Sequence, residues 1–374
     1  MRVLHINCNY IGTTLHQLMV EELGRQGYDN QVYVPTYNKN LSVIIPNSNV
    51  IVSECFKKWD RLVFDYKQSK IIRDLQRNVD VSSFDLIHAY TVFTDGNCAR
   101  KMFQKYNIPY VVTVRNTDVN SFFAKMIHLR KRGIKILQDA KAIFFLSESY
   151  RHQVFDKYVP KHLYDELWKK SQIVPNGIDN FWFENIATNA HEKQLGDKIK
   201  LVYAGRIDKN KNIPTTQRAM DILSSKGYNV ELTVVGKVQD KSEFSIISNH
   251  SQTIYLPPMN KEKLIEVYRS SHIFVMPSHT ESFGLVYVEA MSQGLPVIYS
   301  EGQGFDGQFD EGVVGYHANS HSAESVAEAI INVVNNYSRL VSVVVGKSQK
   351  FNWSEIVKAY CNVYGNIEET QCVR

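Results

Sequence analysis

A strand, a glycine turn and a helix follow one another at two widely separated places in this sequence. Near the start, the apolar run 3–7 is followed by a loop with Gly12 and then by an apolar-periodic stretch over 15–23. Far downstream, the apolar run 199–204 leads through a glycine turn to a helical pattern over 214–223. This order opens a βαβ unit, in which helices connect parallel strands. Its recurrence predicts two such units.

Further strand-like runs follow each opening, with helical patterns between most of them. We expect strands at 31–34, 86–89, 110–114, 142–146, 231–235, 253–256, 273–276 and 296–299. Strands that alternate with helices predict an α/β fold with a parallel, doubly wound sheet. Because the alternation restarts near residue 199, we expect two Rossmann-like domains, each able to bind a ligand at the carboxyl ends of its strands.

The junction between the domains is expected within 175–196, which contains a Pro-Asn-Gly turn and a polar run. We therefore expect an N-terminal domain over 1–180 and a C-terminal domain over 181–351. The last segment, 352–374, is predicted to form an amphipathic helix that belongs with the N-terminal domain. Its apolar residues at helical spacing are Trp353, Ile356, Val357, Tyr360 and Val363 or Tyr364.

The composition excludes several classes of protein. The 374 residues, with a net charge of +5, fit two or three soluble domains of about 150 residues and neither a disordered nor a fibrous chain. The five scattered cysteines form no CxxC pair, which argues against a zinc site or a disulfide framework. No apolar run approaches the roughly 18 residues of a membrane span, and the first residues look like a strand rather than a signal peptide. A cytoplasmic location is expected.

The segment 276–297 carries the strongest functional pattern. A strand ends in a polar loop, and a helix is expected from near residue 282 to Gly294. The free N–H groups and positive dipole end of such a helix suit a phosphate, which Gly284 lets approach closely. Glu281 and Glu289 can accept hydrogen bonds from sugar or ribose hydroxyls. Taken alone, Glu281 is better explained as a charge favoured at a helix start and Glu289 as part of a solvated face, and it is the whole segment that indicates a site.

Two cations follow the strand 199–204. Arg206 can hold a diphosphate through two parallel hydrogen bonds, and Lys211 adds a mobile point charge. Neutralising a departing diphosphate lowers the barrier to breaking its bond to a sugar. Taken alone, this turn is as well explained by a solvated basic loop.

Together these motifs resemble glycosyltransferase family 4. The pattern is a strand with Gly-Arg-x4-Lys, followed by Glu-x7-Glu with Ser-Phe-Gly after the first Glu. Further matches lie at 85–89, 175–179 and 351–353, and the resemblance is dense over 174–297. It implies a retaining, nucleotide-sugar-dependent enzyme of the GT-B fold. In that fold two Rossmann-like domains face each other across a cleft, and the last helix crosses back to the first domain.

The resemblance also implies roles for individual residues. Arg206 and Lys211 would hold the donor diphosphate, Glu281 would lie against the donor sugar, and these three would be catalytic. Glu289 would bind the ribose, and Gly12 would let the N-terminal domain close on the diphosphate. Loop amides would assist, and the donor-binding residues of the loop would be Ser282, Phe283, Gly284, Leu285 and Val286. No cofactor and no metal are expected, since the cations and the helix dipole would take the role of a divalent ion.

The sequence departs from the family pattern in places. Arg115 occupies the position of a family histidine; it only donates hydrogen bonds, and would hold a sugar hydroxyl or a carboxylate. The first loop has only Gly12 where many members have a glycine pair, and 235–238 has one glycine of two. These changes leave the donor sugar open. His88, at the end of the run 86–89, is expected to line the donor site rather than act as a base.

The expected partners are a nucleotide sugar, with UDP favoured by family frequency, and a saccharide or lipid-linked acceptor of surface glycan synthesis. Residues 101–170 hold 14 Lys or Arg against 6 Asp or Glu, and 124–137 mixes aliphatic residues with five cations. That stretch indicates either peripheral contact with the inner face of a membrane or a solvated surface. No nucleic-acid motif is present. The alternatives are an epimerase or phosphorylase on the same scaffold, or a non-catalytic nucleotide-sugar binder.

Overall fold

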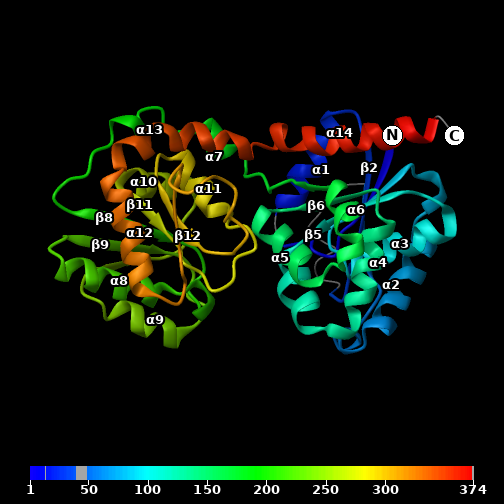
Figure 1. Ribbon diagram of the computed structural model, residues 1–374, viewed down its shortest axis with the longest axis horizontal. Coiled ribbons are helices and arrows are strands. Elements are labelled where there is room, and N and C mark those ends of the chain that lie inside the picture. Colours follow the sequence, from blue (N-terminus) through cyan, green and yellow to red (C-terminus); the bar gives the residue numbers. More distant parts are fainter. Residues whose placement is uncertain (13, 39–48, 373–374) are drawn as a thin grey trace. The chain divides into compact units, whose positions relative to one another are not determined.

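The computed structural model describes residues 1–12, 14–38 and 49–372, and the chain divides into two compact units. Unit 1 comprises Met1–Gly177 and the segment from Trp353 onward, and unit 2 comprises Ile178–Asn352. Both are α/β domains built on parallel sheets, which confirms the predicted fold class (Figure 1). The division lies close to the limits expected at 180/181 and 351/352.

The sheet of unit 1 has seven parallel strands among the described residues, in the order β3-β2-β1-β4-β5-β6-β7. The strands are β1 Arg2–Ile6, β2 Asp29–Thr36, β3 Val50–Glu54, β4 Leu86–Ala89, β5 Tyr110–Val114, β6 Ala142–Phe145 and β7 Ser171–Ile173. The helices are α1 Leu15–Arg25, α2 Phe64–Asn78, α3 Asp95–Tyr106, α4 Arg130–Asp139, α5 Glu148–Tyr158, α6 Tyr164–Lys169 and α14 Trp353–Cys372. Strands β3 and β7 were not expected from the sequence.

Apolar layers cover both faces of this sheet. Val3 and Leu86 pack in the layer with α1 and α14, whereas their neighbours Leu4 and Ile87 pack in the layer with α2 to α5. Successive side chains of a strand point to opposite faces, so strands buried on both sides read as continuous apolar runs. This double burial explains why the central strands were recognisable from sequence alone.

Helix α14 returns to unit 1 and lies beside α1 (Figure 1). The predicted helix over 352–374 is confirmed from Trp353 to Cys372, and residues 373–374 lie outside the described part of the chain. Its buried residues are Trp353, Ile356, Val357, Tyr360, Val363, Tyr364 and Ile367. Neither α14 nor any other described helix is both long and apolar enough to cross a membrane.

The sheet of unit 2 has six parallel strands in the described chain, in the order β10-β9-β8-β11-β12-β13. They are β8 Ile199–Ala204, β9 Val230–Val235, β10 Thr253–Leu256, β11 Ile273–Val275, β12 Val297–Ser300 and β13 Gly315–Ala318. The helices are α7 Phe181–Glu184, α8 Ile213–Ser225, α9 Lys241–Ser248, α10 Lys261–Ser270, α11 Leu285–Ser292, α12 Ala323–Asn335 and α13 Tyr337–Ser348. Strand β13 was not expected.

Candidate active site

The strand order of unit 2 places two important loops next to each other. The chain leaves β8 toward β9 on one side, while β11 pairs with β8 on the other side. At such a switch point the loops that follow the two strands diverge and leave room for a ligand at their carboxyl ends. The loop 205–212 follows β8, and the loop 276–284 follows β11.

Lys211 and Glu281 meet at this switch point. The Lys211 Nζ lies 2.5 Å from the Glu281 Oε2, and both side chains are nearly buried, with exposed fractions of 13% and 12%. The backbone N–H of Ser282 donates to the other carboxylate oxygen at 3.0 Å. An ion pair so well shielded from water is held in one geometry, because breaking it would leave an uncompensated charge. The structure therefore brings two predicted site residues into direct contact.

Two side chains that the sequence analysis missed hold the Glu281 loop. The Asn210 side chain donates to the Thr280 carbonyl at 2.8 Å and accepts from the Thr280 N–H at 3.1 Å. The Gln303 Oε1 accepts from the Glu281 N–H at 3.0 Å. Gln303 sits in a Gly-Gln-Gly sequence just after β12, a signal that could have directed attention to it.

Gly284 begins helix α11 in a left-handed conformation, with φ of +78°. A Cβ on this residue would lie 2.3 Å from the Tyr287 ring, whose hydroxyl donates to the Met276 carbonyl at 2.6 Å. Glycine is therefore required both by the backbone angle and by the packed tyrosine. The first amides of the helix, at Leu285 and Val286, have no carbonyl to bond within it and are suited to an anion.

Arg206 is anchored through its backbone and extends its side chain into solvent. Its carbonyl accepts from the Tyr203 hydroxyl at 2.5 Å, and its exposed guanidinium lies 3.9 Å from Asp208. The Phe283 side chain is buried and contacts the Phe305 ring, which leaves only its backbone for a ligand. Within this site the mobile charge is thus Arg206, and the fixed charge is Lys211.

Glu289 lies about one turn into α11, in different surroundings. Burial raises the pKa of its carboxyl to about 7, although the nearby Lys261 ammonium and the Trp182 indole favour the charged form. Asp179, which pairs with Lys261 at 2.5 Å, raises that pKa further. Glu289 thus lies on the helix that follows the loop 276–284, but its charged neighbours are Lys261 and Asp179 rather than the charges of the switch point.

Arg115 and Gly12 belong to unit 1. Arg115 follows β5, and its Nη1 donates to the Asn176 Oδ1 at 2.8 Å. Burial lowers the pKa of its guanidinium, and its Nε finds no acceptor among the residues described. Gly12, in the loop after β1, has φ of +114° and open space where a Cβ would stand. Their predicted contacts with a donor stay predictions.

His88 does not line a binding site, so that prediction is wrong. It lies inside β4, fully buried, with Nδ1 hydrogen-bonded to the Tyr364 hydroxyl at 2.7 Å and Nε2 to the Thr113 hydroxyl at 3.0 Å. Its ring stacks on Tyr90. Burial lowers the pKa of this imidazole well below its usual range. One ring nitrogen therefore holds α14 and the other holds β5, and neither is left for a ligand.

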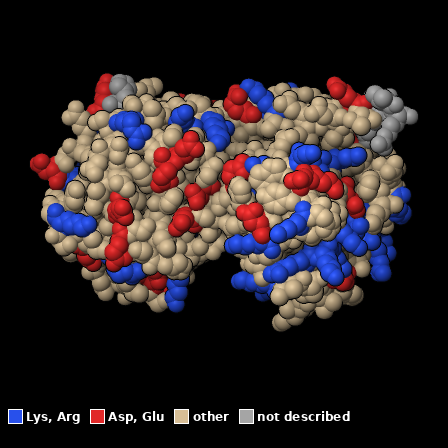
Figure 2. Space-filling model, viewed as in Figure 1, with Lys and Arg blue, Asp and Glu red and all other residues tan. Residues whose placement is uncertain are grey.

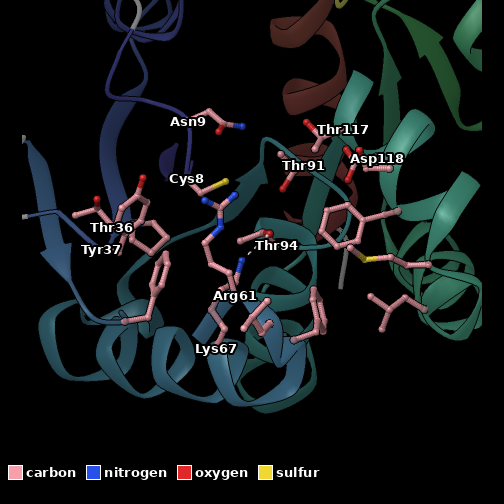
Figure 3. A pocket seen from close by; sticks show the side chains of 18 of the residues that line it. Cys8, Asn9, Thr36, Tyr37, Arg61, Lys67, Thr91, Thr94, Thr117 and Asp118 are labelled. Carbon is pink, nitrogen blue, oxygen red and sulfur yellow. Dashed lines mark hydrogen bonds between the residues drawn. The ribbon is translucent and has the colours of Figure 1, made fainter. Parts of the chain in front are cut away.

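A pocket of about 660 Å³ opens at the carboxyl ends of β1, β2, β4 and β5 in unit 1. Figure 3 shows Arg61 and Lys67 reaching into it toward Cys8 and Thr94. The Lys67 Nζ donates to the Thr94 hydroxyl at 3.4 Å, and within the described chain neither cation forms an ion pair. Sequence reasoning did not find this pocket, because its lining comes from loops spread over 8–129.

The Asp118 carboxylate in this pocket is fully committed to the fold. It accepts from the backbone N–H groups of Val92 and Phe93 at 3.1 and 3.3 Å and from that of Arg115 at 2.9 Å. Burial nevertheless raises its pKa to about 6. Since its oxygens are occupied by amides, the charge presented to a ligand in this pocket comes from Arg61 and Lys67.

Two family models match this chain. The model described as Glycosyltransferase Family 4 covers residues 13–180, and the model described as Glycosyl transferases group 1 covers residues 186–349. The two matches follow one another along the chain and correspond to the first and second α/β domains. These matches, on a chain built of two parallel-sheet α/β domains, make the protein a glycosyltransferase of the GT-B class. The chain belongs to glycosyltransferase family 4.

Individual relatives agree with this assignment. The capsular polysaccharide biosynthesis glycosyltransferase CapM of Staphylococcus aureus is 28% identical over 207 residues, which is 53% of each chain. An uncharacterized glycosyltransferase of Methanocaldococcus jannaschii is 25% identical and covers 96% of this chain and 95% of its own.

Solved structures share the fold of the whole chain. The sucrose-phosphate synthase of Thermosynechococcus elongatus has a TM-score of 0.76 at 18% identity, over 99% of this chain and all of its own. Anabaena HepE in complex with UDP-glucose has a TM-score of 0.65 at 15% identity, over the full length of both chains.

Proposed function

We propose that this glycosyltransferase moves a hexosyl unit from a UDP-sugar to a hydroxyl acceptor with retention of configuration, in the synthesis of a surface glycan or glycoconjugate. The observation that carries the proposal is the buried Lys211–Glu281 pair beside Arg206 and the start of α11. The UDP-glucose bound to HepE supports the choice of donor, and the name of CapM supports the choice of product.

The proposed reaction breaks the bond between the anomeric carbon and the diphosphate oxygen. The electron pair leaves with the diphosphate, where Arg206, Lys211 and the first α11 amides stabilise the growing negative charge. The acceptor hydroxyl forms the new bond on the same face, and its proton passes to the departing diphosphate oxygen. Glu281 positions the sugar and balances the charge of Lys211, while Glu289 accepts hydrogen bonds from the ribose.

The unit 1 pocket is proposed to hold the acceptor. Its threonines and Asn9 offer hydrogen bonds to hydroxyls, and its aromatic side chains offer surfaces for a sugar ring. Arg115, with an unused Nε–H, would donate to a sugar hydroxyl or to a carboxylate. An acceptor in this site would be a saccharide or a lipid-linked saccharide, reached at the cytoplasmic face of a membrane.

The experiment begins with thermal shifts in a panel of nucleotide sugars. A donor at about 100 times its Kd should stabilise the protein by about 2.7 kcal/mol. Transfer is then assayed with that donor, and NMR of the product reports the anomeric configuration. Activity should survive EDTA, since no metal role is proposed. Binding without transfer or donor hydrolysis would instead indicate a non-catalytic nucleotide-sugar binder, and an inverted product would contradict retention.

A further inference from the structure

Large apolar side chains are exposed to solvent on one part of unit 1. The exposed fractions of Trp59, Leu62 and Ile127 reach 77%, 79% and 68%. Other exposed apolar residues of the same region are Tyr37, Val63, Tyr66 and Met126. A stably folded domain rarely leaves so many large apolar groups in water unless they meet another surface. The face formed by 57–67 and 125–132 is called the apolar face below.

Direct contacts join the two segments of this face. The Phe64 ring, at the start of α2, packs edge-on against the Phe122 ring at 6.0 Å. The Arg132 guanidinium, from α4, lies 5.2 Å from the Phe64 ring and pairs with Asp65. In addition, Leu62 and Met126 both line the unit 1 pocket. The two segments are thus joined at the start of α2, and both border that pocket.

The same region is strongly basic. Residues 57–77 hold seven Lys or Arg against three Asp, and 124–137 hold five against no carboxylate. Two of those aspartates are already neutralised, Asp60 by Lys70 at 2.7 Å and Asp65 by Arg132. Figure 2 shows Lys and Arg side chains gathered over α2, α3 and α4. A partner for this surface therefore has to offer negative charge together with apolar contact.

We propose that the apolar face docks on a lipid bilayer that carries anionic headgroups. Tryptophan and tyrosine favour the interface of a bilayer, aliphatic side chains enter its acyl boundary, and lysine reaches the headgroup phosphates. The cations that point into the pocket would then meet an acceptor presented by the membrane. That last step rests on the proposed function, whereas docking itself does not depend on catalysis.

Only part of the stretch 124–137, where membrane contact was expected from the sequence, belongs to the apolar face. A short turn of helix over Ile127–Leu129 precedes α4, and α4 buries Ile134, Ile136 and Leu137. The exposed apolar residues of this stretch are Met126 and Ile127. Most of the apolar face comes instead from 59–66, whose short apolar runs gave no membrane signal in the sequence.

The test measures binding of the full chain to sedimented vesicles of phosphatidylcholine with phosphatidylglycerol, and to vesicles of phosphatidylcholine alone. We expect binding to the anionic vesicles and little to the neutral ones. The double variant Lys58→Gln with Lys125→Gln should bind at least about tenfold more weakly, since a cation near such a surface contributes about fivefold. The matched control is the double variant Lys226→Gln with Lys347→Gln, which changes two exposed lysines of unit 2. This control should bind vesicles as the native chain does.

Apolar insertion has its own readout. Of the four tryptophans, Trp182 and Trp353 are buried, and Trp168 is partly buried beneath the Arg151 guanidinium. The strongly exposed Trp59 should therefore give an emission shift to shorter wavelength on vesicle binding, and Trp59→Phe should abolish that shift. Leu62→Ser with Ile127→Ser should weaken binding, whereas Ile246→Ser with Ile254→Ser, at exposed positions of unit 2, should not.

Several outcomes would overturn the proposal. These are equal binding to both vesicles, native-like binding by either apolar-face variant, or a dimer in light scattering that the Leu62→Ser, Ile127→Ser change dissolves. Circular dichroism and UDP binding are measured on every variant, so that misfolding is recognised. Vesicle binding by a protein that neither binds UDP nor transfers sugar would reject the proposed function and leave the docking surface standing.

Discussion

The side chains of Lys211 and Glu281 act as one unit. Each neutralises the other in a nearly buried place, so the loss of either leaves a charge that the fold cannot accommodate. We predict that Lys211→Ala and Glu281→Ala each lower transfer by about a hundredfold, and that the double variant loses little more than either single one. Initial rates with saturating donor provide the measurement, with Lys226→Ala as the control. Multiplicative losses in the double variant would show that the two residues act independently.

The titration of Glu289 gives a pH dependence with a definite sign. Burial raises the pKa of this carboxyl to about 7, so near neutral pH the free protein holds a mixture of both forms. Only the carboxylate accepts hydrogen bonds from both ribose hydroxyls. Affinity for UDP-glucose, whose diphosphate keeps its charge, should therefore fall by up to about tenfold between about pH 8 and about pH 6.

Isothermal titration of UDP-glucose across that range checks the Glu289 prediction. In Glu289→Gln the affinity should be lower at high pH and should no longer depend on pH. A variant that kept the native pH profile would assign the titration to another group, such as His279, whose ring stacks on a neighbouring ring at 4.8 Å.

At the scale of single elements, Gly177 marks where the chain leaves unit 1. A Cβ there would lie 2.6 Å from the ring of Trp353, which is the first residue of α14. Gly177→Ala should therefore push the tryptophan out of its packing and destabilise the protein by about 1–3 kcal/mol. The control is Gly365→Ala within α14, where a Cβ meets nothing within 4 Å and should stabilise the helix by about 0.5–1 kcal/mol. Thermal unfolding of both variants separates the two effects; a Gly177→Ala protein as stable as the native chain would contradict this packing argument.

The elements also show what the sequence could predict about the fold. Central strands such as β4 and β5 are buried along their whole length and therefore appear as apolar runs. The three missed strands, β3, β7 and β13, all lie at sheet edges. An edge strand is only partly buried, and β3 has no fully buried residue, so its hydrophobic pattern is weak.

The candidate site was likewise predictable only in part. Residue types at strand ends predicted Arg206, Lys211 and Glu281, because the carboxyl ends of parallel strands converge whatever the details of the loops. Asn210 and Gln303 could not be predicted, since their role depends on which backbone groups the loops present to them. His88 was misplaced because its run of apolar neighbours does not reveal which sheet face it points to, or that α14 covers that face.

For the whole molecule, the path of the chain makes the two units unequal. Unit 2 is one continuous segment, 178–352, and contains Arg206, Lys211, Glu281 and Glu289. Unit 1 is completed only when α14 returns, and α14 supplies seven buried apolar side chains to one sheet face. At about 1.5–3 kcal/mol for each buried side chain, their loss exceeds about 10 kcal/mol, which matches the entire stability of a typical domain.

We therefore predict opposite behaviour for the two units expressed alone. A fragment of residues 178–352 should unfold cooperatively and bind UDP, whereas a fragment of residues 1–177 should not reach a folded state. Because Gly177 contacts the Trp353 ring, a short glycine-serine linker that joins 177 directly to 353 should restore the folding of unit 1. Circular dichroism melts and titration with UDP measure both fragments. A cooperative transition in 1–177 alone would mean that α14 is dispensable to the first domain, and failure of 178–352 to bind UDP would mean that the donor site needs residues of unit 1.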